Sequence, residues 1–568
     1  MLDILIRGAQ VFDGLGNPGQ HIDVGVQGDK VVALGTRAKP QLALAAKETI
    51  EAQGLALMPG IVDNHTHYDA QVTWDNACSP SPQMGVTTAV IGNCGFTIAP
   101  CRPEHRDVIM RNLTQVEGMS IDVLRAGIDW KFESIAEYFD FVESRGSLMN
   151  LAGFVGHSSV RTYVMGDQAS RREATSDEVA QMKALVVDGL KAGAIGFATS
   201  TSPAHNGEGG VPMPSRLASD DELRALVSTL GEAGKGVFML TKGGHTKIDF
   251  LASLSQLTSR PVVVAAILHN STNPTVVFDD LDAIEAARAR GLRIHGAISP
   301  CPLTNDFTLR SPYPVEGLIA WRPALALKGD ALKAKLAEPS FREAVRAEVA
   351  APTNFRLFNG EWHKVNVVEA KLAEHAQYEH QNIASLAAKV GQDPLDFMLD
   401  LAISEDLDTV FSAVLLNSDE EAVGRMLKHP ASLVSLSDAG AHLTFFNDAG
   451  FGLHLLGHWC RQLGVLSLPE AIRKLTSEPA KIFGIQKRGL IAEGAYADLM
   501  LFDPARVNRG PKYRAKDLPA GGSRLLTPGI GVLGVWVNGQ RIVGENGELT
   551  ERAMSKSTMP GKFLREFA

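Results

Sequence analysis

The stretch Met58-Pro-Gly-Ile-Val-Asp-Asn-His65-Thr-His67 ends an apolar run with two histidines in i, i+2 spacing. On an extended strand this spacing puts both imidazoles on one face, so the two rings can converge on one point. Neutral imidazole is the commonest protein ligand for zinc-like metals. Because the chain has 16 histidines in 568 residues, the pair can also be two polar residues that end a strand by chance. The rest of the sequence has to separate these two interpretations.

Length and composition indicate a soluble globular protein with more than one folding unit. A chain of 568 residues exceeds the roughly 250–300 residues over which one hydrophobic core usually extends. Its 45% hydrophobic and 21% charged residues are ordinary values for a globular protein. The net charge of −9 gives no basic surface for nucleic acid, although a local site can still attract a small anionic substrate.

The N-terminal residues and the cysteines predict a cytoplasmic location. The chain starts without a signal peptide, and no run of about 18 apolar residues predicts a membrane span. Five cysteines with irregular spacing argue against a disulfide framework and for a reducing compartment. We therefore expect no membrane partner, and a homo-oligomer is compatible with the sequence.

Eight short apolar runs recur along the middle of the chain, each ending near a polar residue: 57–67, 87–94, 148–157, 194–200, 237–242, 261–269, 292–299 and 431–438. Their aliphatic content is typical of strands buried on both faces of a parallel sheet. Helical patterns separate them, such as 175–192 with its N-cap signal, and 220–234 and 278–291, which end at glycine. This alternation predicts an α/β fold, a (β/α)8 TIM barrel, whose active site forms at the carboxyl ends of the strands.

The two ends of the chain predict a separate small β-sandwich. Residues 1–57 and 480–545 contain short strand patterns with turns, and each part alone is too small to bury a core. We expect the barrel to span 58–479. Its insertion at about 300–430 has proline-rich and aromatic segments, which predict an irregular loop that covers the barrel mouth as a lid. Residues 546–568 are expected to form a loosely packed charged tail.

Five of the strand ends carry candidate metal ligands, which a barrel would bring into a ring: His65, His67, Cys94, Lys242, His269 and Asp438. A lysine can bind a metal only when it is neutral, or when CO₂ has converted it to a carbamate that bridges two cations. The thiolate of Cys94 is a second candidate bridge. Asp438 could bind a metal and take the proton of a metal-bound water, whose pKa falls to about 7. This set of groups predicts amide hydrolysis without a covalent intermediate.

Each candidate also has a structural interpretation. Cys94 could be a small buried hydrophobe, Lys242 an ion-pair partner or a clamp for a substrate carboxylate, and His269 a hydrogen-bonding residue at a strand end. Three further histidines are expected to be structural or to support the ligands: His157, His295 and His442. The sequence has no nucleophile elbow, no Walker-type phosphate loop and no dinucleotide-binding glycine motif after a strand.

The chain resembles the amidohydrolase superfamily, and within it the N-acyl-D-amino-acid deacylase (D-aminoacylase) branch, over nearly its whole length. The shared motifs are Pro59-Gly-Ile-Val-Asp-Asn-His-Thr-His, Gly85-Val-Thr-Thr, Gly92-Asn-Cys-Gly-Phe, Gly156-His-Ser-Ser, Ser437-Asp-Ala-Gly-Ala-His442, Thr476-Ser-Glu-Pro and Asp498-Leu-Met-Leu-Phe-Asp. The resemblance implies a metal-bearing barrel with a small β-sandwich. It also implies that His65 and His67 hold one metal, that Cys94 and His269 hold a tightly bound zinc, and that Asp438 is the general acid and base.

The chain departs from this family at three strand ends. The deacylases have a metal-binding histidine in a Thr-His-x-Arg segment at the fifth strand, where this chain has Leu240-Thr-Lys242-Gly-Gly, so a carbamate-bridged pair of metals or a weaker second metal is expected. A family lysine that holds the substrate carboxylate is Ser271 here, which leaves a D-amino-acid substrate open. The fourth-strand loop, 200–205, also lacks the usual Gly-Leu-x-Tyr-x-Pro.

These residues predict a hydrolase with one or two Zn²⁺ ions that cleaves a linear amide, such as an N-acyl amino acid or a similar small molecule. Hydrolysis of a cyclic amide, an ester or a carbamate is an alternative, because the same centre can catalyse all three. A barrel without catalytic activity, used for assembly or ligand binding, is an alternative from another class. The joint presence of His65, His67, His269 and Asp438 argues against it.

Overall fold

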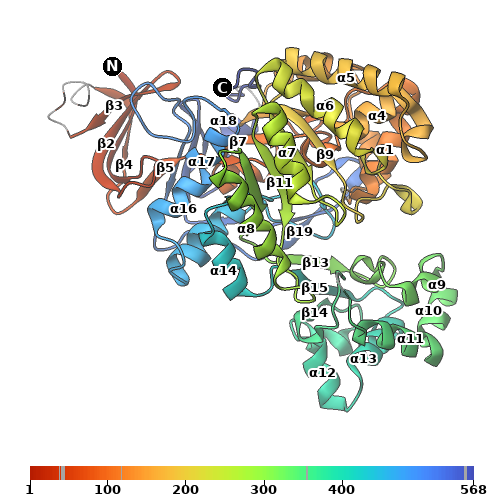
Figure 1. Ribbon diagram of the computed structural model, residues 1–568. Coiled ribbons are helices and arrows are strands. Elements are labelled where there is room, and N and C mark those ends of the chain that lie inside the picture. The colour runs from red at the N-terminus through yellow and green to blue at the C-terminus, as the bar shows by residue number, and fades with distance from the viewer. Residues whose placement is uncertain (37–38, 40–41, 43–44, 117, 354–355, 556–558) are drawn as a thin grey trace.

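Eight parallel strands form the centre of the molecule (Figure 1). The computed structural model describes the chain except for residues 37–38, 40–41, 43–44, 117, 354–355 and 556–558. The strands neighbour one another in chain order: β6 (Ile61–Asp63), β7 (Val86–Ile91), β8 (Asn150–Gly156), β9 (Gly196–Ser200), β10 (Val237–Thr241), β11 (Val262–Ile267), β12 (Ile294–Ile298) and β16 (Ser432–Val434). Beyond the two edge strands, Thr66 and Ala439 form a parallel bridge, and the His67 N–H donates to the Ala439 carbonyl at 2.8 Å. The predicted (β/α)8 barrel is confirmed.

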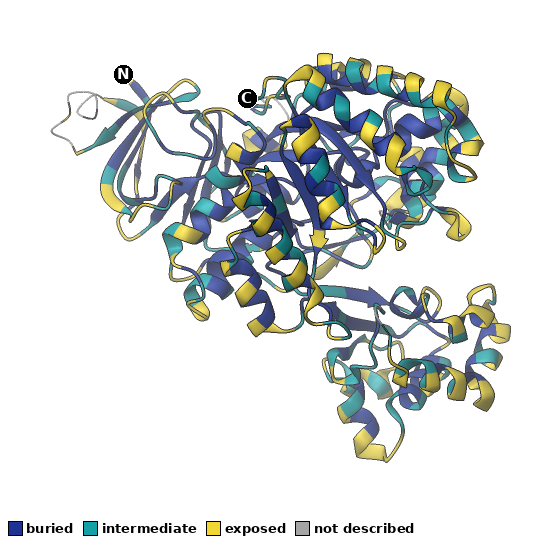
Figure 2. Cartoon of the chain, in the orientation of Figure 1, coloured by how far each residue is buried: buried dark blue, intermediate teal, exposed yellow. Residues whose placement is uncertain are grey.

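The barrel strands are buried on both faces, as their aliphatic sequences predict. Every residue of β7, β8, β9 and β10 is buried, and Figure 2 shows these strands dark between the partly exposed helices. The helices around the barrel are α1 (Arg106–Val116), α2 (Ile121–Gly127), α3 (Ile135–Arg145), α4 (His157–Met165), α5 (Ser176–Lys191), α6 (Asp220–Ala233), α7 (Ile248–Thr258), α8 (Val276–Ala289), α14 (Glu420–Lys428), α16 (Leu468–Leu475) and α17 (Ser477–Ile482). None of the helices in the described part of the chain is both long and apolar enough for a membrane crossing.

The ends of the helices follow their sequence signals. Thr175 caps α5: its hydroxyl accepts the Glu178 N–H, and the Glu178 carboxylate accepts the Thr175 N–H. This reciprocal pair satisfies two backbone donors that the first turn of a helix leaves open. Helix α6 ends at Gly234, whose φ of 64° is a left-handed conformation that glycine adopts at little cost. The three predicted helices are therefore present.

Both ends of the chain meet in a second sheet, which forms the small β domain. Its strand order is β23 (Gln540–Val543), β22 (Val532–Val537), β17 (Leu499–Phe502), β5 (Ala56–Pro59), β1 (Leu2–Val11), β2 (Gln20–Gln27) and β3 (Lys30–Gly35), with β4 (Ala46–Glu51) paired to β1. Successive residues of a strand face opposite sides of a sheet. Leu57 and Leu499 therefore lie in the core of this domain, whereas Met58 and Met500 lie in the core of the barrel. The separate β domain is confirmed, and its exact boundaries stay a prediction.

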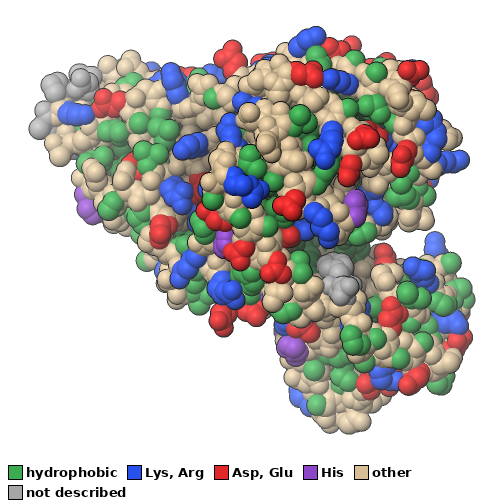
Figure 3. Space-filling model, viewed as in Figure 1, with side chains coloured by type: hydrophobic (Ala, Val, Ile, Leu, Met, Phe, Trp, Pro, Cys, Tyr) green, Lys and Arg blue, Asp and Glu red, His purple; other side chains and the backbone are tan. Residues whose placement is uncertain are grey.

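The insertion between the seventh and eighth barrel strands is a folded lobe with its own core (Figure 1). It contains the antiparallel strands β13 (Leu303–Phe307), β14 (Val365–Glu369) and β15 (Val410–Leu416), and the helices α9 (Arg322–Leu325), α10 (Gly329–Ala337), α11 (Pro339–Ala350), α12 (Ile383–Val390) and α13 (Pro394–Ser404). Its proline-rich entry is irregular, with two short 3₁₀ turns at Tyr313–Val315 and Ile319–Trp321. Two further 3₁₀ segments, Trp362–Lys364 and Ala373–Tyr378, lie in its later connections. The expected irregular loop is thus wrong for most of the insertion, because buried residues such as Trp321 and Phe411 supply a core. Figure 3 shows the surface hollowed between this lobe and the barrel.

Residues 562–564 of the C-terminal tail pack on the barrel, so this part of the tail is not loose; residues 556–558 lie outside the described residues. The Leu151 N–H at the start of β8 donates to the Lys562 carbonyl at 2.9 Å, and the Leu564 N–H donates to the Leu151 carbonyl at 2.7 Å. Between them, the buried ring of Phe563 lies 4.6 Å from the ring of Phe139, measured between centroids. An aromatic residue among the charged ones therefore anchors this segment, which charge alone could not predict.

Candidate metal centre

Three of the predicted ligands converge at the mouth of the barrel. His65 and His67 follow β6, and Cys94 follows β7 at the neighbouring strand end. One ligand atom from each of these three buried residues lies within 4.8 Å of the others, and no other such group exists among the residues that the structure describes. The Cys94 Sγ lies 3.6 Å from the His65 Nε2. The i, i+2 pair therefore does place both imidazoles at one point.

Asp438 completes this cluster from the eighth strand end. Its Oδ1 lies 3.2 Å from the His65 Nε2 and 3.7 Å from the His67 Nε2. Asp438 and Cys94 both have left-handed backbones, with φ of 47° and 57°. Such conformations cost a non-glycine residue on the order of 1–3 kcal/mol, and they persist where the surrounding structure holds them. The two residues that approach the histidines from other strands are thus held in strained positions.

A hydrogen-bond network locks the first strand end to the eighth. The Ser437 hydroxyl donates to the His65 carbonyl at 3.0 Å. The Asn64 amide donates to the Val434 carbonyl at 3.0 Å, and the Ser435 hydroxyl donates to the Asn64 Oδ1 at 2.6 Å. Because all these groups are buried, the loss of one bond would leave a partner unsatisfied. The network therefore fixes the histidine pair against Asp438.

The electrostatics of the cluster suit a divalent cation. Burial lowers the pKa of His65 to about 3, which keeps its ring in the neutral form that binds metals. Burial opposes the ionisation of Asp438, but the hydrogen bond from His67 and the nearby histidines hold its pKa below the usual range. Burial raises the pKa of Cys94, and a bound cation would favour the thiolate instead. Two imidazoles, a thiol and a carboxylate match the donors that zinc takes in proteins.

The structure leaves two predicted ligands outside this cluster. The Lys242 Nζ lies 2.7 Å from the Asp280 Oδ2 on α8, so its ammonium group forms an ion pair with the outer helix layer. The backbone of His269 is bound to Asn417 on both sides, through the N–H at 2.7 Å and the carbonyl at 2.8 Å. Burial lowers the pKa of His269, and the charge of Asp419 is the next largest influence on it. The Lys242 side chain would have to leave Asp280 to join the other ligands.

Two of the weaker histidine candidates lie in other surroundings. His157 donates from Nε2 to the buried Glu222 carboxylate at 2.8 Å, and its Nδ1 pairs with the Thr199 hydroxyl at 2.7 Å. His295 lies on β12, and its Nδ1 is 3.4 Å from the Arg288 guanidinium. Neither belongs to the ligand group of the described residues.

Two further histidines lie near the cluster. His205, in the loop after β9, has its pKa lowered to about 3 by burial, and the charges of His67 and Asp438 also act on it. Its ring packs edge to face on Phe96, with 5.0 Å between centroids. His442 lies in the same loop as Asp438 and affects the pKa of that carboxyl. The sequence analysis did not select His205, although the unusual fourth-strand loop was a signal.

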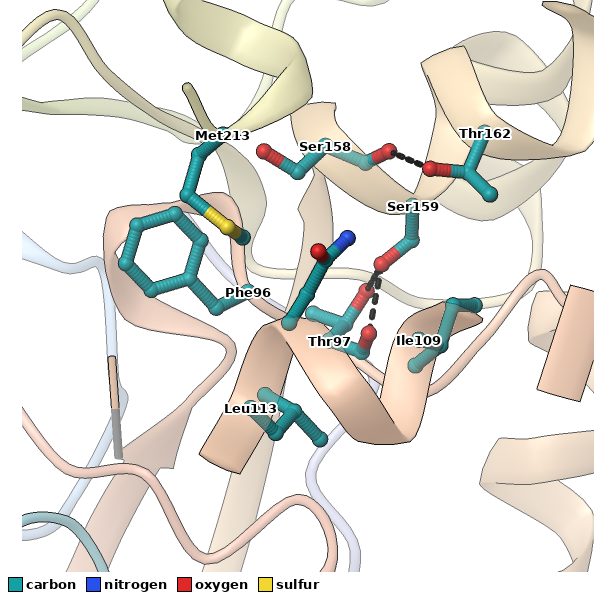
Figure 4. Close-up of a pocket in the computed structure, with 9 residues that line it drawn as sticks. Phe96, Thr97, Ile109, Leu113, Ser158, Ser159, Thr162 and Met213 are labelled. Atoms are coloured by element: carbon teal, nitrogen blue, oxygen red, sulfur yellow. Dashed lines mark hydrogen bonds between the residues drawn. The ribbon is translucent and has the colours of Figure 1, made fainter. Parts of the chain in front are cut away.

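A small hollow is lined by Phe96, which follows the turn that carries Cys94 (Figure 4). Its interior space of about 10 Å³ holds about one water molecule. Its walls are Phe96, Thr97, Ile109, Asn112, Leu113, Ser158, Ser159, Thr162 and Met213. In Figure 4 the Ser159 hydroxyl lies against Thr97, to whose carbonyl it donates. The wall thus combines apolar side chains with hydroxyl groups.

Comparison with known proteins places the chain in a family. The model of the amidohydrolase family matches residues 48–543. The chain is 26% identical to D-aminoacylase of Alcaligenes xylosoxydans xylosoxydans over 517 residues, which cover 89% of each chain. It is 25% identical to N-acyl-D-glutamate deacylase of the same organism over 531 residues, 92% of this chain and 91% of the other.

A solved structure shows the same fold. N-acyl-D-glutamate deacylase from Bordetella bronchiseptica, complexed with zinc and a phosphonate inhibitor, superimposes over the whole of both chains with a TM-score of 0.65 at 22% identity. The match of the family model over most of the chain confirms the resemblance described above. The chain belongs to the amidohydrolase family, in its D-aminoacylase-like branch.

Proposed function

We propose that this protein is a zinc-dependent hydrolase that cleaves the linear amide bond of an N-acyl amino acid or a similar small amide. The observation that carries this proposal is the convergence of His65, His67 and Cys94 within 4.8 Å, with Asp438 beside them. The relatives named D-aminoacylase and N-acyl-D-glutamate deacylase support the choice of an amide substrate.

The four residues divide the chemistry between binding and proton transfer. His65, His67, Cys94 and Asp438 would hold a zinc ion, which when bound lowers the pKa of a water to about 7 and polarises the substrate carbonyl. The ionised Asp438 takes a proton from the attacking water as its oxygen bonds to the carbonyl carbon. It then delivers this proton to the amide nitrogen as the carbon–nitrogen bond breaks. The products are a carboxylic acid and an amine, so one water is consumed for each bond cleaved.

A second zinc ion stays a prediction. Lys242 would contribute to it only after its ammonium group leaves Asp280. Carboxylation of Lys242 likewise requires that its amine leave the ion pair. We propose one zinc at the described cluster as the minimum that the reaction needs.

The cytoplasm and a small-molecule substrate complete the proposal. All five cysteines are free, which supports a reducing compartment. The relatives named N-acyl-D-glutamate deacylase and D-aminoacylase support a small-molecule substrate.

A hydrolysis screen tests this function. Purified protein is incubated with N-acetyl-D- and L-amino acids (glutamate, aspartate and methionine), simple anilides and hydantoins, and amine release is measured before and after dialysis against a chelator. We expect release from at least one N-acetyl amino acid, its loss on chelation and its return with Zn²⁺. Activity that is confined to hydantoins would favour the cyclic-amide alternative. A protein with no bound zinc and no chelator-sensitive hydrolysis would contradict the proposal.

A further inference from the structure

A series of contacts connects the fourth barrel strand, β9, with the metal ligands, and His205 lies beside it. The Thr201 N–H, just after β9, donates to the Thr241 carbonyl at 2.9 Å, and the Thr241 hydroxyl lies 3.1 Å from the Cys94 Sγ. The His205 ring packs on Phe96, which follows Cys94 in the same turn. The loop after β9 therefore runs beside the cluster and brings an imidazole to its edge.

The loop also holds the backbone of His205 in place. The Met213 N–H and the Arg216 guanidinium both donate to the His205 carbonyl, at 3.2 Å and 3.1 Å. The Ser215 hydroxyl donates to the Ser200 carbonyl at 2.9 Å and so ties the return of the loop to the strand end. These hydrogen bonds hold the loop backbone at His205 against the end of β9.

The hydrogen bonds around Ser200 select one tautomer of His205. The Ser202 N–H donates to the Ser200 Oγ at 3.1 Å, and the same oxygen lies 2.7 Å from the His205 Nδ1. If the Ser200 hydroxyl donates to Nδ1, the Ser202 N–H and the Ser200 O–H both have an acceptor. The opposite direction would leave the buried hydroxyl hydrogen without one, which is unfavourable. The imidazole therefore carries its proton on Nε2, and burial keeps the ring neutral.

We propose, resting on the function proposed above, that His205 is a catalytic residue that donates its Nε2–H to the carbonyl oxygen of the substrate amide. As the water oxygen bonds to the carbonyl carbon, the π electrons move to this oxygen, and a fixed donor stabilises the negative charge. When the carbon–nitrogen bond breaks, the electrons return to the carbonyl, and His205 keeps its proton throughout. Its role is thus separate from that of Asp438, which moves the proton.

At the end of the neighbouring strand, β10, the cationic side chain is bound outside the cluster. Lys242 follows β10, next to β9, and its ammonium group is held by Asp280 on the outer layer. His205 is not part of the ligand group among the described residues, so we assign it to the substrate and not to the metal. The donor comes from the loop, while the lysine beside it faces away.

Three variants and one control test the proposal. His205→Ala removes the donor, His205→Gln restores an N–H, and Ser200→Ala removes the group that orients the ring. His245→Ala is the matched control, because this histidine is exposed in the following loop. The readouts are zinc per chain, kcat and KM for the best N-acetyl amino acid of the screen, and inhibition by its phosphonate analogue.

We expect His205→Ala to retain the zinc content of wild type while kcat falls on the order of 10²–10³-fold, as for the loss of one oxyanion donor. KM should change little, the phosphonate should bind more weakly in parallel with kcat/KM, and His205→Gln should recover part of kcat. Ser200→Ala should give a smaller loss of kcat with zinc retained. His245→Ala should match wild type in every measurement.

Other results would overturn the proposal. Wild-type kcat in His205→Ala would show that no donor was lost, and loss of zinc in that variant would make His205 a ligand. If His205→Ala does not fold, Ser200→Ala decides, because an unchanged kcat there contradicts the assigned role. A wild-type protein without amide hydrolysis would overturn the proposed function, and this inference with it. An active wild type with an equally active His205→Ala overturns the inference alone.

Discussion

Two arcs of the barrel rim carry similar candidate residues but arrange them differently. At the ends of strands β6, β7 and β16, the residues His65, His67, Cys94 and Asp438 converge in a buried cluster. At the ends of β10 and β11, Lys242 pairs with a carboxylate outside the barrel, and His269 lies apart from the cluster. A position at a strand end is therefore not sufficient to bring a side chain into the cluster. The first arc also has the hydrogen bonds and strained backbones that aim its side chains inward.

The largest effect is expected from Asp438→Asn in the first arc. The amide cannot accept the proton of water, so kcat for amide hydrolysis should fall on the order of 10³-fold or more while zinc remains bound. Steady-state kinetics together with metal analysis measure both quantities. Full activity in this variant would show that Asp438 does not transfer the proton. The two arcs would then no longer differ in this role.

Substitution of Glu222, which lies between the two arcs, should have the next largest effect, and this effect is on the stability of the protein. Its buried carboxylate accepts from His157 and is paired with the buried Arg161. Glu222→Gln leaves the Arg161 charge uncompensated, and we expect a loss of about 3 kcal/mol in the free energy of unfolding. The exposed neighbour Asp221→Asn is the control, with a change within about 0.5 kcal/mol.

The same pair predicts how stability depends on pH. Burial disfavours the charged Glu222, but His157 and Arg161 outweigh it and hold its pKa below the usual range of a glutamate. Burial also lowers the pKa of His157 below 6.5. Both groups therefore have a higher pKa in the unfolded chain than in the folded protein, so the unfolded chain takes up protons first as the pH falls. The contribution of each group to the free energy of unfolding is complete above its unfolded pKa and is lost as the pH falls below that pKa. Because the Glu222 carboxylate raises the pKa of His157, its removal should lower that pKa further. Urea unfolding between pH 7 and pH 5 should therefore show a steeper loss of stability in Glu222→Gln than in wild type, and parallel curves would contradict this assignment.

Gly440→Ala should perturb the first arc moderately. Gly440 has a φ of 91°, and a Cβ there would lie 2.7 Å from the backbone carbon of His67. The left-handed conformation alone costs an alanine roughly 1–2 kcal/mol, and the contact would push the His67 backbone away. The midpoint temperature of thermal unfolding and the affinity for zinc should both decrease. Gly464→Ala, with a φ of 61° and open space around its Cβ position, is the control that shares only the conformational cost.

Lys242→Ala, in the second arc, should have the smallest effect. Each side chain of the Lys242–Asp280 pair is 18% exposed, and such a pair contributes less than about 1 kcal/mol. We expect zinc content and kcat close to wild type. A loss of zinc in this variant would show that the lysine turns inward or is carboxylated, and the two arcs would then share the metal.

The sequence predicts the barrel well because buried parallel strands are apolar along their whole length, and their ends mark the active-site rim. It also predicts His65, His67, Cys94 and Asp438, because motifs at strand ends keep their place in the fold. It could not place the side chain of Lys242, since the partner Asp280 lies on a later helix. His205 lay in a loop whose path only the tertiary structure defines. The insertion needed a three-dimensional core to show that it is a folded lobe.

Zinc analysis of two histidine variants tests the central claim most directly. His67→Ala removes a ligand from the first arc, and His269→Ala removes the buried histidine of the second. After dialysis against metal-free buffer, elemental analysis should find about one zinc or more per chain in wild type and in His269→Ala, and almost none in His67→Ala. Zinc retained in His67→Ala but lost in His269→Ala would contradict the account, because the metal would then belong to the second arc.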